Sequence, residues 1–338
     1  MIPLVTHSVK RHVGIENMGL GVYNVVVSKA FLALICMPLL MGGACEKKST
    51  AKAGDNGAIT ALDRADPGSD SKADPLATTG QVDTTPLSGV DVSKLSSDKQ
   101  QTFYKLLGSL SSPCGKAHSL RTSFTSDSSC KRAPFAVRYV LSLLEDEANE
   151  DQTRTEYEHK YKPASNDPVK LDVSKAPHAG AEDAPVRLVE FYDYGCPHCQ
   201  AFKPMMDQVM ADEAGKVVEY FMMFPLDKHP DSKSAAQAAL AANEQGRFKD
   251  MHDVLFARAP MHDHEHVTEY AMTLGLDMTK FEAAYNQEQG HVESDLKQGE
   301  AAGVDSTPTL FFNDRKYEGP MHPKYIEMWI DEELAVNR

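Results

Sequence analysis

A pair of cysteines at the junction between a strand-like and a helix-like segment constrains the fold more than any other feature of the chain. Residues 186–194, VRLVEFYDY, have the β-branched and aromatic composition of a strand, and residues 199–215 follow with a helical pattern. Residues 217–226, VVEYFMMFPL, indicate a second strand. This order predicts a β-α-β unit in which Cys196 and Cys199 lie where the helix begins.

The C-terminal part of the chain extends this unit. Residues 232–303 are rich in Ala, Glu, Gln and Met and are punctuated by glycines, which predicts four or five amphipathic helices. Residues 307–320, TPTLFFNDRKYEGP, predict a hairpin that turns at Asn313 and Asp314, and residues 323–336 predict a last helix. The expected order of elements is therefore βαβ, several helices, then ββα.

The sequence Cys-Pro-His-Cys is suited to thiol-disulfide exchange. Cys196 is expected at a helix N-terminus, where free N–H groups and the helix dipole stabilise the thiolate, which is the attacking form of cysteine. His198 can lower the pKa of this thiol further, and Pro197 restricts the loop. Cys199, one turn into the helix, is expected to resolve the mixed disulfide. A stabilised thiolate also makes the disulfide a stronger oxidant.

Other uses of such a cysteine pair have less support in the sequence. The pair could form an inert disulfide or supply half of a zinc site. No second Cys-x-x-Cys and no suitably spaced pair of histidines accompanies the motif, which disfavours zinc.

The order of elements and four motifs carry a family resemblance. The motifs are EFYDYGCPHC, FPLDKHP, AALAANEQGRF and STPTLFFN, and Pro308 lies 109 residues after Cys199. Residues 168–338, about half of the chain, resemble the DsbA-like thiol-disulfide oxidoreductases of the thioredoxin superfamily. The resemblance implies an α/β thioredoxin fold, with a helical insertion at about 230–303 between the Cys-x-x-Cys unit and the hairpin.

Further site residues follow from this resemblance. Glu190 matches an acid that lies buried beneath the cysteines and assists proton transfer at the second one. Pro308 matches a proline with a cis peptide bond that faces the cysteines, and Thr307 would present backbone groups to an extended substrate peptide. Many of the most oxidising relatives have Val in place of Thr307, so the direction of electron flow stays open. Asp193 is expected to be a surface acid of the neighbouring loop.

The N-terminus has the character of an export signal. Basic residues precede the uncharged stretch 30–44, which is short for a membrane span and ends in small residues before Cys45. Residues 1–45 therefore predict an export signal, and the small residues before Cys45 resemble a bacterial lipoprotein signal in which the cysteine is lipidated. Ordinary cleavage or an uncleaved anchor are the alternatives.

Two further segments separate the signal from the Cys-x-x-Cys domain. Residues 46–90 are dominated by small and polar residues, which predicts a disordered tether. Residues 91–165 predict a small helical segment, and the Cys-x-x-Cys domain is expected at 166–338. Cys114 and Cys130 lie in a turn-rich stretch of the helical segment, where a structural disulfide is expected to stabilise a small core; a second redox pair is the alternative.

The expected function is that of an exported thiol-disulfide oxidoreductase, acting as an oxidase of substrate proteins. It needs no organic cofactor or metal beyond its redox-active cysteines. The expected location is the periplasm or cell envelope, with a lipid anchor and a membrane redox partner. A formal net charge of −14 argues against nucleic acid as a partner.

Two alternatives remain at this stage. The protein could be a disulfide reductase or isomerase that receives electrons from a membrane donor. It could instead be a copper-binding carrier with a thioredoxin fold, which would use the two cysteines and the histidines of the sequence MHDHEH, namely His262, His264 and His266.

Overall fold

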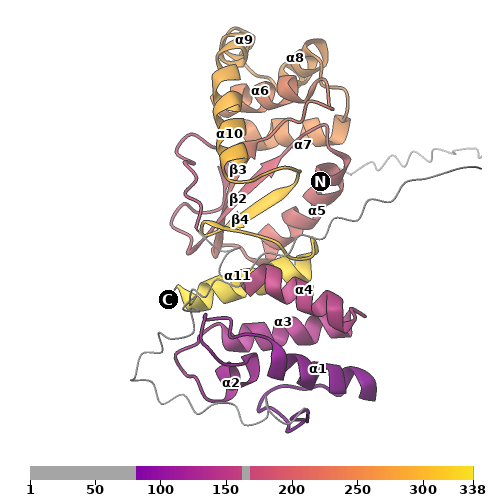
Figure 1. Ribbon diagram of the computed structural model, residues 1–338. Helices are drawn as coiled ribbons and strands as arrows, with labels where there is room; N and C mark the ends of the chain where they lie inside the picture. The colour runs from indigo at the N-terminus through magenta and orange to yellow at the C-terminus, as the bar shows by residue number, and fades with distance from the viewer. Residues whose placement is uncertain (1–80, 162–167, 338) are drawn as a thin grey trace, which may run out of the picture. The chain divides into compact units, whose positions relative to one another are not determined.

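The computed structural model describes residues 81–161 and 168–337, which form a helical unit and a mixed sheet covered by helices (Figure 1). The expected export signal, Cys45, most of the expected tether and the expected boundary near residue 165 lie outside the described residues. None of the helices in the described residues is both long enough and apolar enough to cross a membrane.

The sheet has five strands in the order β1-β3-β2-β4-β5. The strands are β1 (His178–Ala179), β2 (Val186–Tyr192), β3 (Val217–Met223), β4 (Thr309–Phe312) and β5 (Arg315–Lys316). β2 runs parallel to β3 and antiparallel to β4, while β1 and β5 are short antiparallel edge strands. The hairpin between β4 and β5 turns at Asn313 and Asp314, which both have a positive φ, as the sequence predicts.

Two helices cover one face of the sheet. They are α5 (Pro197–Asp212) and α11 (Pro323–Val336). Alternate residues of β2 point to this face, where Leu188 packs with Phe202 of α5 and Ile326 of α11. The residues between them point to the other face, where Phe191 and Phe311 belong to a second apolar cluster. The sheet is therefore buried on both faces, which explains the nearly continuous apolar sequence of its central strands.

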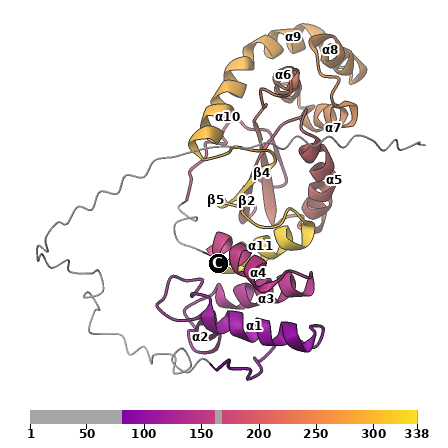
Figure 2. The same cartoon turned by 45° about the vertical axis from the view of Figure 1, so that its right-hand side comes forward.

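The predicted helical insertion consists of five helices. They are α6 (Ser232–Asn243), α7 (Phe248–Arg258), α8 (His264–Thr273), α9 (Met278–Gln287) and α10 (Gln289–Ala301). Figures 1 and 2 show α6 to α9 together beyond the end of the sheet at which α5 begins. α10 runs from them to the sheet, where Leu296 packs with the apolar cluster of Phe191 and Phe311. The shared core of these helices also contains Cys196 and Cys199. The insertion therefore forms part of the wall around the cysteine pair.

The N-terminal described residues form a unit of four helices. They are α1 (Ser97–Ser109), α2 (Leu120–Thr125), α3 (Ala133–Glu145) and α4 (Glu150–Tyr161). Ser96 and Ser119 cap α1 and α2 by accepting hydrogen bonds from backbone N–H groups. Cys114 and Cys130 form a disulfide before α3.

One expected boundary is wrong. The tether was expected to extend to residue 90, but residues 81–90 pack against the helical unit. Leu87 is buried in its core, and Arg121 donates a hydrogen bond to the Thr85 carbonyl and pairs with Asp83. Val82 and Val90 also pack against this core, so the polar segment is held by apolar contacts as well as by Arg121 of α2.

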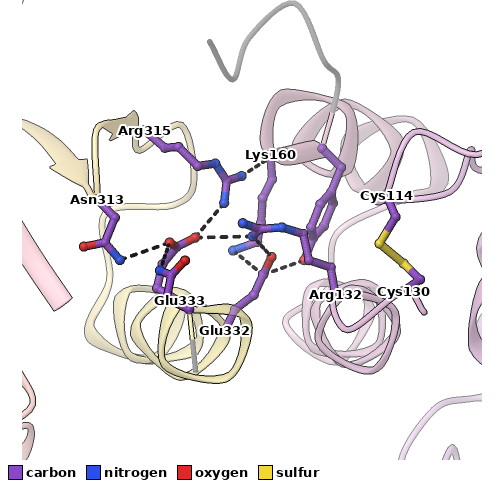
Figure 3. Close-up of polar contacts among 10 residues, drawn as sticks. Cys114, Cys130, Arg132, Lys160, Asn313, Arg315, Glu332 and Glu333 are labelled. Atoms are coloured by element: carbon purple, nitrogen blue, oxygen red, sulfur yellow. Dashed lines mark hydrogen bonds and ion pairs between the residues drawn. A yellow bond between two sulfur atoms is a disulfide. The ribbon is translucent and has the colours of Figure 1, made fainter. Parts of the chain in front are cut away.

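The helical unit is joined to the sheet domain through α11. Tyr325 and Met328 of α11 belong to the apolar core of the helical unit. Beside them, Lys160 lies 3.0 Å from Glu332, and both side chains are almost fully buried (Figure 3). Arg132 also binds Glu332, and Arg315 of the hairpin binds the adjacent Glu333. Because a buried charge is costly without a partner, this network fixes how the two units fit together.

Candidate active site

Cys196 is held at the start of α5 by the loop before it. It is the N-cap residue of the helix, and Pro197 occupies the first turn. Its backbone N–H donates to the carbonyl oxygen of Asp193 at 3.0 Å. The side chain is 3% exposed and is a free thiol, as is that of Cys199. The helix N-terminus therefore directs its free N–H groups toward the Cys196 sulfur.

The surroundings of Cys196 favour its thiolate. A hydrogen bond from the Cys199 thiol is the main cause that lowers the pKa of Cys196 to about 4. Burial opposes this shift, while hydrogen bonds from Thr307 and from the backbone N–H groups of Cys199 and His198 add to it. At neutral pH Cys196 is therefore a thiolate, which is the form that attacks a disulfide.

Cys199 has the opposite character. It is 1% exposed, and burial raises the pKa of its thiol far above the usual range. The hydrogen bond that it gives to Cys196 and the nearby charge of Glu190 raise the pKa further. One cysteine is thus ready to react, while the other stays protonated until a proton acceptor takes its proton.

Two buried carboxyl groups lie beneath α5. Glu190 on β2 is 8% exposed, and Glu219 on β3 is 4% exposed. Burial raises the pKa of Glu190 well above its usual value, and the neighbouring Glu219 raises it further. Burial also raises the pKa of Glu219 to about 7. The sequence analysis singled out Glu190 and missed Glu219, although a lone acid in an apolar strand is the same signal in both strands.

The loop before the cysteines rests on a buried carboxylate. Asp193 is 1% exposed, so the expectation that it is a surface acid is wrong. It accepts hydrogen bonds from the N–H groups of Gly195 and Leu226, and it binds His229 at 2.6 Å. The carboxylate is buried because these donors come from the ends of β2 and β3, which the sequence does not show as neighbours.

Gly195 allows the loop to approach α6 closely. A side chain at this position would place its Cβ 2.4 Å from the Ser232 hydroxyl and 2.8 Å from His229. The N–H of Gly195 also donates to the Ser232 hydroxyl. No residue larger than glycine fits here without a shift of the loop that carries Cys196.

A buried polar chain borders the site on the side of α7. The hydroxyl groups of Tyr192 and Tyr194 are 2.9 Å apart, and the Tyr194 hydroxyl is 3.1 Å from Nδ1 of His252. Burial lowers the pKa of His252 to about 3, so its ring is neutral. The sequence analysis did not find this chain, because its members come from the end of β2, the loop after it and an insertion helix.

The segment before β4 completes the site. The Thr307–Pro308 peptide bond is cis, and the Cys196 sulfur lies 3.5 Å from the Thr307 carbonyl oxygen. The Thr307 hydroxyl is buried, and among residues 81–161 and 168–337 it has no hydrogen-bond partner apart from the Cys196 sulfur, whose pKa it lowers. The predicted residues Cys196, Cys199, Thr307 and Pro308 are thus brought together.

Comparisons with known proteins agree with this geometry. Residues 172–332 match the family model described as thioredoxin. This part of the chain is therefore similar to the thioredoxin family. The expected thioredoxin fold with a helical insertion is confirmed for the domain.

Solved structures similar to the chain cover about half of it. BdbD from Bacillus subtilis is 24% identical with a TM-score of 0.45, and covers 50% of this chain and 98% of its own. The thiol-disulfide exchange protein alpha-DsbA2 from Wolbachia pipientis is 25% identical with a TM-score of 0.43, and covers 48% of this chain and 88% of its own.

Curated relatives are longer than the matched region. The Na(+)/H(+) antiporter NhaA 3 from Salinispora tropica is 35% identical over 156 residues, which are 45% of this chain and 24% of the antiporter. The antiporter NhaA from Herminiimonas arsenicoxydans is 35% identical over 145 residues, or 41% of this chain and 22% of the antiporter. The chain spans about a quarter of the length of these relatives.

The remaining candidates are the histidines. His198 is exposed, and its backbone N–H donates a hydrogen bond that lowers the pKa of Cys196. The three histidines expected to form an alternative metal site bind separate partners: His262 the carbonyl of Leu255, His264 the carboxylate of Glu282, and His266 that of Asp263. The described residues contain no group of three or more metal-binding side chains. The histidines diverge because Asp263 caps α8, which turns His264 and His266 onto a helix.

Proposed function

We propose that the protein is an exported thiol-disulfide oxidoreductase that oxidises cysteine pairs in substrate proteins through Cys196 and Cys199. The observation that carries the proposal is the contrast between the two thiols: the pKa of Cys196 is lowered to about 4, and that of the buried Cys199 is raised. A stable Cys196 thiolate favours the reduced form of the protein, so its disulfide tends to pass to another protein.

The reaction begins with the disulfide between Cys196 and Cys199. A substrate thiolate attacks the Cys196 sulfur, the bond between the cysteines breaks, and Cys199 leaves and takes up a proton. A second substrate thiolate then attacks the substrate sulfur of this mixed disulfide, and Cys196 leaves as a stabilised thiolate. The substrate gains a disulfide and the protein holds two reduced cysteines, which a membrane redox partner then oxidises again.

The substrate is held beside the cis proline. The backbone of Thr307 lies against the Cys196 sulfur, where its peptide groups can pair with an extended chain whose cysteine reaches the same sulfur. The location proposed is the periplasm or cell envelope, with a lipid anchor at Cys45. Because the antiporters match over only 24% of their length, ion transport is not carried over to this chain.

The reduction potential of the cysteine pair tests this function. The full protein is equilibrated with glutathione buffers, and the redox state of Cys196 and Cys199 is read by mass-tagging of free thiols, with the Cys114 and Cys130 peptides followed separately. A potential near roughly −120 mV supports an oxidase, and one near roughly −270 mV shows a reductase instead. In cells, Cys199→Ser should accumulate mixed disulfides with substrate proteins, and Cys196→Ser should not.

A further inference from the structure

Two acidic side chains from neighbouring strands share the space beneath α5. In the parallel pairing of β2 with β3, Leu188 lies opposite Glu219, and Glu190 lies opposite Phe221. Side chains two residues apart on a strand point to the same face. Glu190 and Glu219 are therefore diagonal neighbours on the face that α5 covers, and each lies within hydrogen-bonding reach of the other.

The two groups cannot both be charged without a large cost. Both are buried, and two adjacent buried carboxylates repel each other. The Oε1 atom of Glu219 is buried and accepts no hydrogen bond from a donor among residues 81–161 and 168–337. A proton held between the two carboxyl groups supplies the missing donor and removes one of the charges.

Charged groups on α5 and α7 act on this pair. Lys203 binds Asp207 at 2.6 Å and Asp253 at 2.8 Å, while Lys249 binds Asp253 at 2.6 Å. The charges of Lys203 and Asp207 act on both carboxyl groups, and that of Lys249 acts on Glu219. The side chains of Asp207, Asp253 and Lys249 are about half exposed. Glu219 is thus the member of the pair on which Lys249 also acts.

We propose that Glu190 and Glu219 hold one proton as a pair, that this proton passes to and from Cys199 during thiol-disulfide exchange, and that Glu219 exchanges it with solvent. The inference rests on the proposed function. When the bond between the two cysteines breaks, Cys199 leaves as a thiolate and the pair donates the proton. In the reverse step the pair takes the proton from the Cys199 thiol, and the thiolate attacks the Cys196 sulfur and expels the substrate thiolate.

The titration of the two groups fits this role. Burial and the presence of Glu219 raise the pKa of Glu190 well above its usual value, which favours its protonated form. Burial raises the pKa of Glu219 to about 7. A pair with one such member both gives and takes a proton near neutral pH, which is the condition for efficient acid-base catalysis. Glu219 acts through Glu190 and is a positioning residue.

Single-turnover kinetics separate the two cysteines. The reduced full protein is mixed with an aromatic disulfide that releases a coloured thiolate at each step. The first release reports attack by Cys196 and the second reports attack by Cys199 on the mixed disulfide. The second rate is expected to rise with pH through an inflection near pH 7 in the native protein, and the first rate is expected to lack this inflection.

Substitution of Glu219 tests the pair. In Glu219→Gln, the second release is expected to slow on the order of tenfold at neutral pH. Its inflection near pH 7 should be lost, because that inflection belongs to Glu219 and glutamine does not titrate. Glu219→Asp keeps a second carboxyl group and should retain an inflection near that of the native protein. Asp295→Asn is the matched control, since it removes another buried carboxyl group that contacts β3, and its second release should be unchanged.

The outcomes distinguish this inference from the proposed function. A native protein that gives no coloured release at all contradicts the proposed function itself. Two releases with no inflection near pH 7 in the second overturn the proton pair without touching that function, and this result needs no variant. A Glu219→Gln protein whose second release is slower by the same factor at every pH also contradicts the shared proton. A purely structural effect would slow the rate without changing the inflection.

Discussion

Cys196 and Thr307 are separated by 111 residues in the chain, yet the Cys196 sulfur lies 3.5 Å from the Thr307 carbonyl oxygen. The contact joins the N-terminus of α5 to the segment before β4. It places the reactive sulfur, the cis peptide bond of Pro308 and the Thr307 hydroxyl at one site. The reactivity of Cys196 therefore depends on groups from both parts of the domain.

The pH dependence of Cys196 alkylation is the first prediction. In the reduced protein its rate with iodoacetamide should rise through an inflection near pH 4, while Cys199 stays unmodified. Because a hydrogen bond from the Cys199 thiol is the main cause of the low pKa, Cys199→Ala should move the inflection to higher pH. Cys199→Ser keeps a donor and should shift it less. An inflection near the usual cysteine value in the native protein contradicts the site geometry.

The same pKa predicts how the stability of the reduced protein depends on pH. The pKa of Cys196 is about 4 in the folded protein and 9.0 in its ordinary state. The folded state therefore gains stability from the thiolate, fully above about pH 9, and loses this gain as the pH falls toward 4. The difference in unfolding free energy between reduced native protein and Cys196→Ser should shrink over that range. Urea unfolding at several pH values measures it, and a difference that is constant with pH argues against a low pKa.

The Thr307 hydroxyl supplies a separate prediction. Thr307→Val keeps the shape of the side chain and removes a hydrogen bond that lowers the pKa of Cys196. The alkylation inflection should move to higher pH, and the reduction potential of the cysteine pair should become more negative, because the thiolate is less stable. Thr307→Ser keeps the hydroxyl and serves as the control. Equal inflections in the Val and Ser variants would show that the Thr307 hydroxyl does not lower the pKa of Cys196.

The parts of the site that the sequence predicts are those determined by local order along the chain. A strand followed by two cysteines at a helix start places Cys196 at the helix N-terminus, whatever packs around it. The hairpin at Asn313 and Asp314 is similarly local. The resemblance to a known family adds Glu190 and Pro308, whose roles depend on distant segments and have no local signal strong enough to stand alone.

The parts that the sequence does not predict depend on contacts between distant segments. Asp193 is buried because donors from Leu226 and His229 meet it at the ends of two strands. The chain of Tyr194 and His252 needs the insertion to fold back over the site. Glu219 had a usable signal, an acid within an apolar strand, but the strand alone does not say that a second acid lies beside it.

The disulfide of the helical unit is predicted to stabilise that unit without affecting the reactivity of Cys196 and Cys199. Replacing Cys114 and Cys130 with Ser should lower the free energy of unfolding of the helical unit by about 3 kcal/mol, since the bond joins residues that are 16 positions apart in the chain. The two-step release by Cys196 and Cys199 should keep its rates, because the disulfide belongs to a separate apolar core. Hydrogen exchange of α1 and α3 measures the first effect. Loss of the second release in this variant would show that the pair of Cys114 and Cys130 is redox-active rather than structural.

The buried ion network between the units gives the last prediction. Lys160→Met leaves the Glu332 carboxylate without the ammonium group that lies 3.0 Å from it, inside a region closed to water. The free energy of unfolding should fall by about 3–5 kcal/mol, as for other broken buried pairs. The double variant Lys160→Met with Glu332→Leu removes both charges and should regain much of this loss. Arg138→Ala breaks an exposed pair with Asp331 on the same helix α11 and should cost less than about 1 kcal/mol. Equal losses in the buried and exposed variants, measured by urea unfolding, would show that the network does not hold the helical unit to α11.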